Sequence, residues 1–173
     1  MKKKNKRFLF WITGLSGSGK TSVSKKITPF IKKRYGPTIN LSGDDIRKTF
    51  GFDKFDKASR IKYAMFYSKL CKILVDEGYT VIFSTVSLFN KVREWNKINI
   101  KGYVEIYIEA DINKLIKKKN KFFYKKKKFV NIVGKNIKAE FPKKAAIIVK
   151  NDFSRSLNNM RDELIQKIKK KYD

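Results

Sequence analysis

Residues 14–21 read GLSGSGKT and fit the phosphate-binding pattern G-x-x-x-x-G-K-[ST]. The glycines of such a loop let backbone N–H groups point inward at a phosphate, and the helix that follows adds the favourable end of its dipole. We expect Lys20 to reach the β- and γ-phosphates of a nucleoside triphosphate, and the hydroxyl of Thr21 to bind Mg²⁺. The predicted nucleotide-binding residues are Gly14, Ser16, Gly17, Ser18, Gly19, Lys20, Thr21 and Ser22.

A second candidate for chemistry is the aspartate pair in INLSGDDIRKTFGF, residues 39–52. One carboxylate here can orient or deprotonate an acceptor hydroxyl and hold Mg²⁺ through water, whereas an aspartate before a helix can also cap it. We assign Asp44 to chemistry and Asp45 to the cap. Three basic residues follow on this helix and the next, namely Arg47, Lys57 and Arg60. Such residues are ordinarily isolated surface charges, but their clustering near an acid favours an anionic acceptor.

The elements that position these residues follow from five short apolar runs that alternate with segments of helical spacing. The runs are residues 8–13, 38–41, 80–86, 103–109 and 145–149. Continuous apolar strands alternating with helices predict an α/β fold with a parallel sheet covered on both faces. The phosphate loop then follows the first strand and opens a helix near Lys20, which argues against a chance glycine-rich turn. Asp44 follows the second strand, so both candidate sites lie at the carboxyl edge of the sheet.

Two later helices are indicated by their apolar stripes. The first, from about Asp56 to Glu77, ends at Gly78 and buries one set of residues: Ile61, Ala64, Met65, Ser68, Cys71 and Val75. The last begins after Ser154 and aligns Leu157, Met160, Leu164 and Ile168. Because no repeat or linker interrupts the pattern, we expect a single domain over residues 1–173.

Composition limits the possible chemistry. The chain has no histidine and one cysteine, which excludes disulfide frameworks, zinc sites of the usual kind and histidine acid–base catalysis. Cys71 is expected to be a core residue. The net charge of +28, mostly from lysine, attracts polyanions of any kind, so it does not separate nucleic acid from phosphorylated small molecules. No apolar run approaches the roughly 18 residues of a membrane span, and we expect a soluble, cytoplasmic protein.

Several segments of the chain resemble the adenylyl-sulfate (APS) kinase family of P-loop kinases, in the family's own order. They are FWITGLSGSGKTSVSKKI, LSGDDIR, GFDKFDKASRIKY, FSTVSLFNKVREW and FFYKKKK. The resemblance implies a three-layer P-loop kinase fold, with a five-stranded parallel sheet, helices on both faces and a Lys-rich lid over about residues 119–142. It also implies a homodimer that takes a small-molecule nucleotide, with no specific nucleic acid and no membrane as partner.

The family transfers the γ-phosphoryl of ATP to the ribose 3′-hydroxyl of a nucleotide acceptor, with Mg²⁺ and without a covalent intermediate. By resemblance, Asp44 is the acceptor-hydroxyl base and Lys20 the second catalytic residue, while Arg47 holds the phosphate-containing arm of the acceptor. The expected acceptor-binding residues are Asp44, Arg47, Phe52, Lys57, Arg60, Ser87 and Ile132. A lid excludes water from the γ-phosphate, and its residues to test are Tyr124, Lys125 and Lys126, with Gly134 as a hinge.

Departures from the family pattern concern the acceptor. Lys57 and Arg60 stand where the family has Arg and Asn, and Leu88 stands where it has Pro. Ile132 replaces a Phe that stacks on the acceptor's adenine, a contact worth roughly 1–3 kcal/mol, while the partner aromatic Phe52 remains. These changes favour a smaller base. The branch of the family that acts on cytidine diphosphoramidate, in capsular methyl phosphoramidate biosynthesis, is the first choice, and APS is the second.

Two other classes of function stay open at this stage. Nine lysines and no acid in residues 114–128 suit a nucleic-acid binder or a regulator that holds ATP without transferring it. A kinase with a sugar acceptor, like shikimate or gluconate kinases, would share the phosphate loop. The aromatic Phe52 favours an acceptor that contains a base.

Overall fold

The centre of the molecule is a five-stranded parallel sheet, seen in a computed structural model that describes residues 6–118 and 131–173. The strands are β1 (Leu9–Thr13), β2 (Thr38–Ser42), β3 (Thr80–Thr85), β4 (Tyr103–Glu109) and β5 (Ile147–Lys150). Their order across the sheet is β2-β3-β1-β4-β5, and every neighbouring pair is parallel. β1 therefore lies in the middle, and the loop that follows it opens at the carboxyl edge of the sheet.

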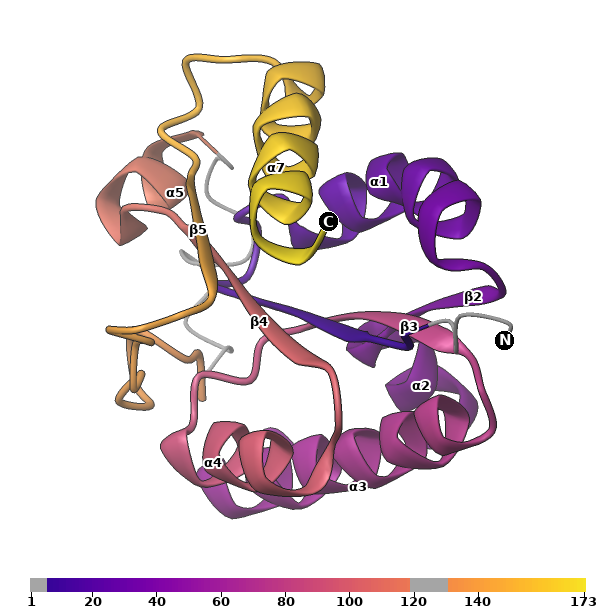
Figure 1. Ribbon diagram of the computed structural model, residues 1–173. Coiled ribbons are helices and arrows are strands. Elements are labelled where there is room, and N and C mark those ends of the chain that lie inside the picture. The colour runs from indigo at the N-terminus through magenta and orange to yellow at the C-terminus, as the bar shows by residue number, and fades with distance from the viewer. Residues whose placement is uncertain (1–5, 119–130) are drawn as a thin grey trace, which may run out of the picture.

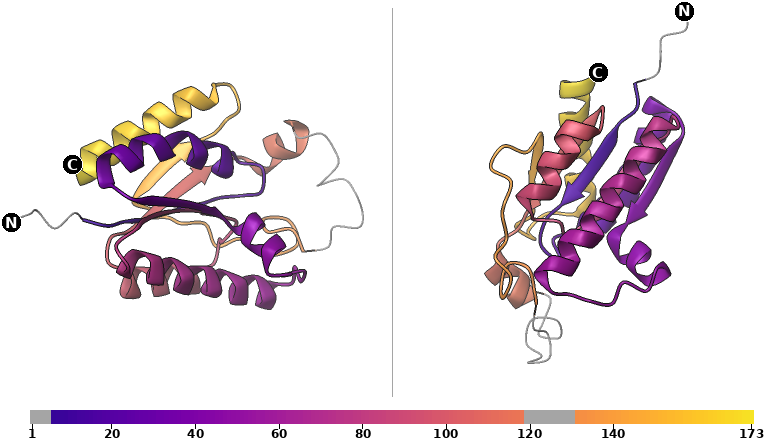
Figure 2. Two further views of the ribbon diagram at one scale, coloured as in Figure 1. Left: turned by 90° about the vertical axis from the view of Figure 1, so that its right-hand side faces the viewer. Right: turned by 90° about the horizontal axis from the view of Figure 1, so that it is seen from below.

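Helices cover both faces of the sheet, as Figure 1 shows. Helices α1 (Lys20–Tyr35) and α7 (Leu157–Tyr172) lie on one face, and α3 (Lys57–Asp76) and α4 (Asn90–Asn99) lie on the other. Two short helices, α2 (Gly43–Thr49) and α5 (Ile112–Lys118), lie at the end toward which the strands run (Figure 2, left). The predicted α/β fold with three layers and a five-stranded parallel sheet is thereby confirmed.

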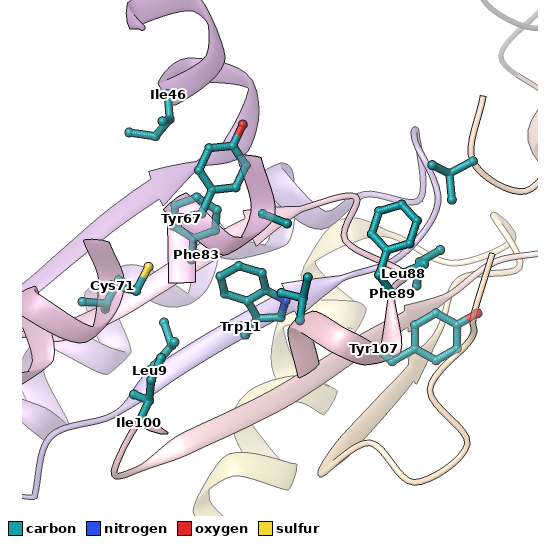
Figure 3. Packing of buried hydrophobic residues seen from close by; sticks show 14 of the residues in the cluster. Leu9, Trp11, Ile46, Tyr67, Cys71, Phe83, Leu88, Phe89, Ile100 and Tyr107 are labelled. Carbon is teal, nitrogen blue, oxygen red and sulfur yellow. The ribbon is translucent and has the colours of Figure 1, made fainter. Parts of the chain in front are cut away.

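Alternation along β1 builds the two halves of the core. Leu9 and Trp11 are fully buried under α3 and α4, whereas Phe10 and Ile12 point to the opposite face, under α1 and α7. Figure 3 shows the first of these clusters, in which the ring of Trp11 stacks on Phe83 of β3 with centroids 5.1 Å apart. Because β1 is packed on both faces, it gives the phosphate loop a rigid base.

Most of the predicted boundaries agree with the structure. The fifth strand lies one to two residues later than predicted, at residues 147–150. Helix α3 begins after Asp56, whose carboxylate accepts from the Ser59 N–H at 2.9 Å, and the chain leaves it at Gly78 with a φ of 91°. Cys71 is a core residue, as predicted, and its burial raises the pKa of its thiol.

No helix in the described ranges is long and apolar enough to cross a membrane.

Candidate active site

The phosphate loop runs from the end of β1 into α1. Gly14, at a φ of 150°, approaches β4 so closely that a Cβ atom there would lie 2.5 Å from the Ile108 carbonyl oxygen. The Ser18 N–H donates to the Leu15 carbonyl at 3.1 Å, and α1 starts after Gly19, whose carbonyl accepts from the Val23 N–H at 2.9 Å. This strand–loop–helix connection is the arrangement that phosphate-binding loops require.

Lys20 and Thr21 occupy the first turn of α1. Lys20 is 7% exposed, and its Nζ donates to the Leu15 carbonyl at 2.7 Å, which holds the ammonium against the loop. The hydroxyl of Thr21 lies 3.5 Å from that of Ser84 at the end of β3, a residue that the sequence analysis did not select. Ser16 and Ser22 are exposed. Ser18 is fully buried, and its hydroxyl has no hydrogen-bond partner among the described residues.

Asn151, directly after β5, is a further part of the loop that sequence reasoning missed. Its Nδ2 donates to the Ser18 carbonyl at 2.9 Å, and its Oδ1 accepts from the Phe153 N–H at 3.0 Å. The side chain is buried, at 8% exposure. It therefore fixes the phosphate loop to the connection between β5 and α7. No local signal could have identified this bond, because the two residues are 133 positions apart.

Asp44 and Asp45 open helix α2, but neither is its N-cap. The cap is Ser42, whose hydroxyl accepts from the Asp45 N–H at 3.1 Å and donates to the Asp45 carboxylate at 2.7 Å. The prediction that Asp45 caps the helix was wrong, because a serine three residues earlier supplies the cap and the Asp45 carboxylate only accepts from the hydroxyl of that serine. Asp44 is exposed at the carboxyl edge of the sheet, where the prediction placed it.

Arg60 lies in the electrostatic field of both Asp44 and Arg47. Burial lowers the pKa of the Arg60 guanidinium, the positive charge of Arg47 lowers it further, and the carboxylate of Asp44 opposes both effects. Tyr67 of α3 lies beneath the same group: its hydroxyl donates to the Gly43 carbonyl at 3.4 Å, and burial raises its pKa to about 12. The structure thus brings together an exposed carboxylate and two arginines from different helices, as the sequence analysis expected.

Phe52 lies in a cluster of aromatic rings between α2 and α3. It stacks face to face on Tyr63, with ring centroids 4.4 Å apart and an angle of 2° between the planes, and the edge of Phe66 meets it at 5.4 Å. Because Tyr63 covers one face of Phe52, at most one face remains for a base. Tyr63 was not selected from the sequence.

The remaining acceptor candidates have other contacts in this structure. Lys57 is 3.9 Å from the carboxylate of Glu140, which also accepts from the Asn90 N–H at 2.6 Å at the start of α4. The carbonyl oxygen of Ile132 accepts from three N–H groups of a tight turn, residues 135–137. Ser87 is fully buried, and its carbonyl oxygen accepts from the Thr13 hydroxyl at 3.1 Å. Its side chain offers no surface to an acceptor here.

The carboxyl-terminal part of the expected lid packs on the phosphate loop. Gly134, at a φ of 90°, lies so close to Leu15 that a Cβ atom there would be 2.7 Å from Leu15 Cδ2. Asn131 accepts from Arg60 through its carbonyl oxygen at 2.9 Å. The expected lid residues Tyr124, Lys125 and Lys126 lie outside the described residues. The described part of the segment thus connects the nucleotide loop with Arg60.

Comparisons with known proteins identify the family of the chain. The sequence model of the family described as adenylylsulphate kinase matches residues 6–150. A cytidine diphosphoramidate kinase of Campylobacter jejuni is 38% identical over 170 residues, which cover 96% of this chain and 98% of that protein. A probable adenylyl-sulfate kinase of Pyrococcus abyssi is 31% identical over 120 residues, which cover 69% of each chain. An APS kinase of Mycobacterium tuberculosis, solved with AMPPNP and APS, has a TM-score of 0.82 at 22% identity and covers 95% of this chain and 98% of its own.

A parallel sheet with a phosphate loop between β1 and α1 defines a P-loop nucleotide-binding fold. The chain belongs to the adenylylsulphate kinase family. It is therefore a phosphotransferase that uses ATP to phosphorylate a hydroxyl group of a nucleotide. The kinase interpretation is thereby confirmed over the non-catalytic one.

Proposed function

We propose that this kinase transfers the γ-phosphoryl group of ATP to the ribose 3′-hydroxyl of cytidine diphosphoramidate, in the biosynthesis of capsular methyl phosphoramidate. One observation carries the choice of acceptor. The relative named for cytidine diphosphoramidate is 38% identical over 96% of this chain, whereas relatives named for adenylyl sulfate from Pyrococcus abyssi and Bacteroides thetaiotaomicron are 31% identical over 69% and 27% identical over 94% of it. Ile132, in place of the expected stacking ring, is consistent with the smaller base of cytidine.

In this proposal Asp44 is the base of the reaction. Its exposed carboxylate accepts the proton of the 3′-hydroxyl as that oxygen bonds to the γ-phosphorus, while the bond from the γ-phosphorus to the β–γ bridging oxygen breaks and ADP leaves. Arg47 and Arg60 bind the anionic arm of the acceptor and hold its ribose near Asp44. Phe52, stacked on Tyr63, contacts the base. Lys57 meets the far end of the arm after separating from Glu140, a partly exposed partner 3.9 Å away that binds it weakly.

The phosphate loop holds ATP through its backbone N–H groups, and Lys20 moves from the Leu15 carbonyl to the transferring phosphoryl group. Mg²⁺ is the expected metal, because it binds phosphate oxygens and water and needs few protein ligands. The hydroxyl of Thr21, beside that of Ser84, fits this role, and Asp44 would contact the ion through water. Bound there, Mg²⁺ would neutralise charge on the phosphates. Ser87, Tyr124, Lys125 and Lys126 stay predictions, as do a homodimeric state and a cytoplasmic location.

The acceptor is tested by supplying Mg²⁺ and ATP with cytidine diphosphoramidate, CDP, APS and ADP in separate reactions, and by assigning the product with phosphorus NMR. We expect a new phosphomonoester on the ribose of cytidine diphosphoramidate, formed faster than on any other acceptor. Phosphorylation of APS alone would overturn the proposal in favour of adenylyl-sulfate kinase, which the description of the matching family favours as the second candidate.

The roles of Lys20 and Asp44 are tested on the same reaction. Lys20→Ala removes one positive charge from the developing transition state and should lower kcat by about 10²–10³-fold with the fold retained. Asp44→Asn keeps the shape but loses the base, and should lower kcat by about 10²–10⁴-fold while ATP still binds. Unchanged turnover in either variant contradicts its assignment.

A further inference from the structure

Phe55 lies in the connection between α2 and α3, and its ring contacts two guanidinium groups. The Cζ atom of Arg47 is 3.8 Å from the ring centroid, and that of Arg60 is 5.4 Å away. Phe55 is 49% exposed, so hydrophobic burial alone does not explain its place. Both contacts are short enough for attraction between a cation and the negative face of an aromatic ring.

The same short connection also supplies backbone acceptors for both arginines. Arg47 Nε donates to the Phe52 carbonyl at 3.2 Å, and Arg60 Nε donates to the carbonyl of Phe55 itself at 2.8 Å. A second nitrogen of Arg60 donates to the Asn131 carbonyl at 2.9 Å. Since each guanidinium has five N–H groups, donors remain on both residues for a ligand.

Neither arginine forms an ion pair with a carboxylate within residues 6–118 and 131–173. The two are close enough for the positive charge of Arg47 to disfavour the charged form of Arg60. Asp44 and Asp56 favour the charged form of Arg60 from beyond ion-pair distance, so two like charges held together without a carboxylate in direct contact need a further source of attraction. In this structure the ring of Phe55 and the backbone carbonyls provide it.

We propose that Phe55 is the positioning residue of the acceptor site: it holds the guanidinium groups of Arg47 and Arg60 together so that they bind a doubly charged, diphosphate-type arm. This inference rests on the proposed function, because it takes the two arginines as the contacts of the acceptor's arm. Phe55 acts through the arginines and needs no contact with the reacting atoms. A side chain without an aromatic face would leave the two cations free to separate.

The test compares Phe55→Leu with Phe55→Tyr, which keeps the ring, and with Tyr79→Leu, an exposed aromatic beyond the end of α3. Phe55→Leu should raise the KM for the nucleotide acceptor on the order of tenfold. The kcat and the KM for ATP should stay within about twofold of the wild type, and Phe55→Tyr should restore the acceptor KM. A purely structural role would instead lower the melting temperature and change both KM values, and that result overturns the proposal.

A second measurement separates this inference from the identity of the acceptor. Binding of inorganic pyrophosphate is titrated with the phosphate loop saturated by Mg²⁺ and ADP, so the arginines are measured without turnover. Phe55→Leu should weaken this binding on the order of tenfold, and Phe55→Tyr and Tyr79→Leu should not. This outcome supports the role of Phe55 even if no cytidine nucleotide is phosphorylated. Equal affinity in wild type and Phe55→Leu, or no saturable binding to the wild type, overturns it. If Phe55→Leu does not fold, Phe55→Met takes its place with the same expected results.

Discussion

Asn151, the first residue after β5, donates from its side-chain amide to the carbonyl oxygen of Ser18 in the phosphate loop, at 2.9 Å. The bond joins the loop after the central strand to the connection after the edge strand. The same side chain accepts from the Phe153 N–H, so it fixes both segments at once. Asn151 therefore stabilises the loop geometry in which, on the proposed function, Gly19 and Lys20 meet the triphosphate.

We expect Asn151→Ala to weaken ATP binding with little effect on the acceptor. The substitution leaves the buried Ser18 carbonyl without its partner, a change that costs about 1–3 kcal/mol and loosens the loop. Asn151→Asp should be at least as harmful, because it places a negative carboxylate against that carbonyl oxygen. The measurement is the KM for ATP at saturating acceptor. Asn158→Ala, an exposed asparagine of α7, is the control, and an ATP KM that is equal in all these variants contradicts the prediction.

Gly134→Ala should disturb the phosphate loop from the opposite side. The added Cβ atom would lie 2.7 Å from Leu15 Cδ2, and the residue has a φ of 90°, so the variant combines a steric clash with backbone strain. We expect a lower melting temperature and a higher KM for ATP, because Leu15 belongs to the loop and its carbonyl holds Lys20. Thermal unfolding and ATP kinetics on the same preparation measure both effects.

The variant Gly51→Ala separates the backbone strain of Gly134→Ala from its steric clash. Gly51 also has a positive φ, of 64°, but nothing lies within 4 Å of its added Cβ atom. It should lose stability through backbone strain, roughly 1–2 kcal/mol, without a change in the KM for ATP. Leu15→Ala combined with Gly134→Ala should recover part of the loss, since the clashing atom is gone. A double variant whose loss equals the sum of the single losses would show that Leu15 and Gly134 do not interact.

The sequence predicts what depends on local patterns. Apolar runs and a loop motif suffice for five strands and the phosphate loop, because both are encoded in consecutive residues. Asn151 was missed because its partner Ser18 is far away in sequence. Phe55 was missed for another reason: an exposed aromatic in a connecting segment has no periodicity, and its value depends on where two arginines from other helices lie. The error at Asp45 was local, since Ser42 and Asp45 are both good capping residues and only the exact start of α2 decides between them.

Arg93 of α4 and Glu105 of β4 form a buried ion pair, with 3.2 Å between Arg93 Nε and Glu105 Oε1. Arg93 also donates to the side chain of Asn90, so the pair fixes the start of α4. Arg93→Met leaves the Glu105 carboxylate buried without its counter-charge and should cost about 3–5 kcal/mol. Urea unfolding at neutral pH measures this decrease in the free energy of unfolding. Glu94→Gln, an exposed acid of the same helix, should change the free energy of unfolding by less than about 0.5 kcal/mol.

The same pair predicts a pH dependence. Burial raises the pKa of Glu105 above its ordinary value of 4.5, against the opposing effect of Arg93. The folded state therefore binds the proton of the Glu105 carboxyl more tightly than the unfolded state does. The stability that this tighter proton binding contributes is fully present below pH 4.5. It is lost as the pH rises through the folded-state pKa of Glu105. Arg93→Met removes the charge that lowers the pKa of Glu105, so the loss of stability should extend to higher pH. Glu105→Gln removes the titrating group and should abolish this pH dependence. Identical pH profiles of unfolding for wild type and Glu105→Gln would refute the assignment.

Ser42→Ala should damage the acceptor side specifically. Its hydroxyl caps α2 and exchanges two hydrogen bonds with Asp45, and α2 carries Asp44 and Arg47. Loss of an N-cap costs about 0.5–2 kcal/mol, and fraying of this seven-residue helix should raise the acceptor KM and lower kcat while the KM for ATP changes little. Ser42→Thr retains a hydroxyl that can accept from the Asp45 N–H and donate to its carboxylate, and should recover most of the stability.

The chain offers a matched control in Ser156, the N-cap of α7, which accepts from the Asn159 N–H at 3.2 Å and donates to the Asn159 side chain at 2.9 Å. Ser156→Ala removes the same two kinds of bond from a helix that carries no proposed acceptor residue. It should lower the free energy of unfolding by a similar amount and leave the acceptor KM unchanged. If both serine variants change acceptor kinetics equally, the effect comes from global stability, and the start of α2 has no special part in placing Asp44.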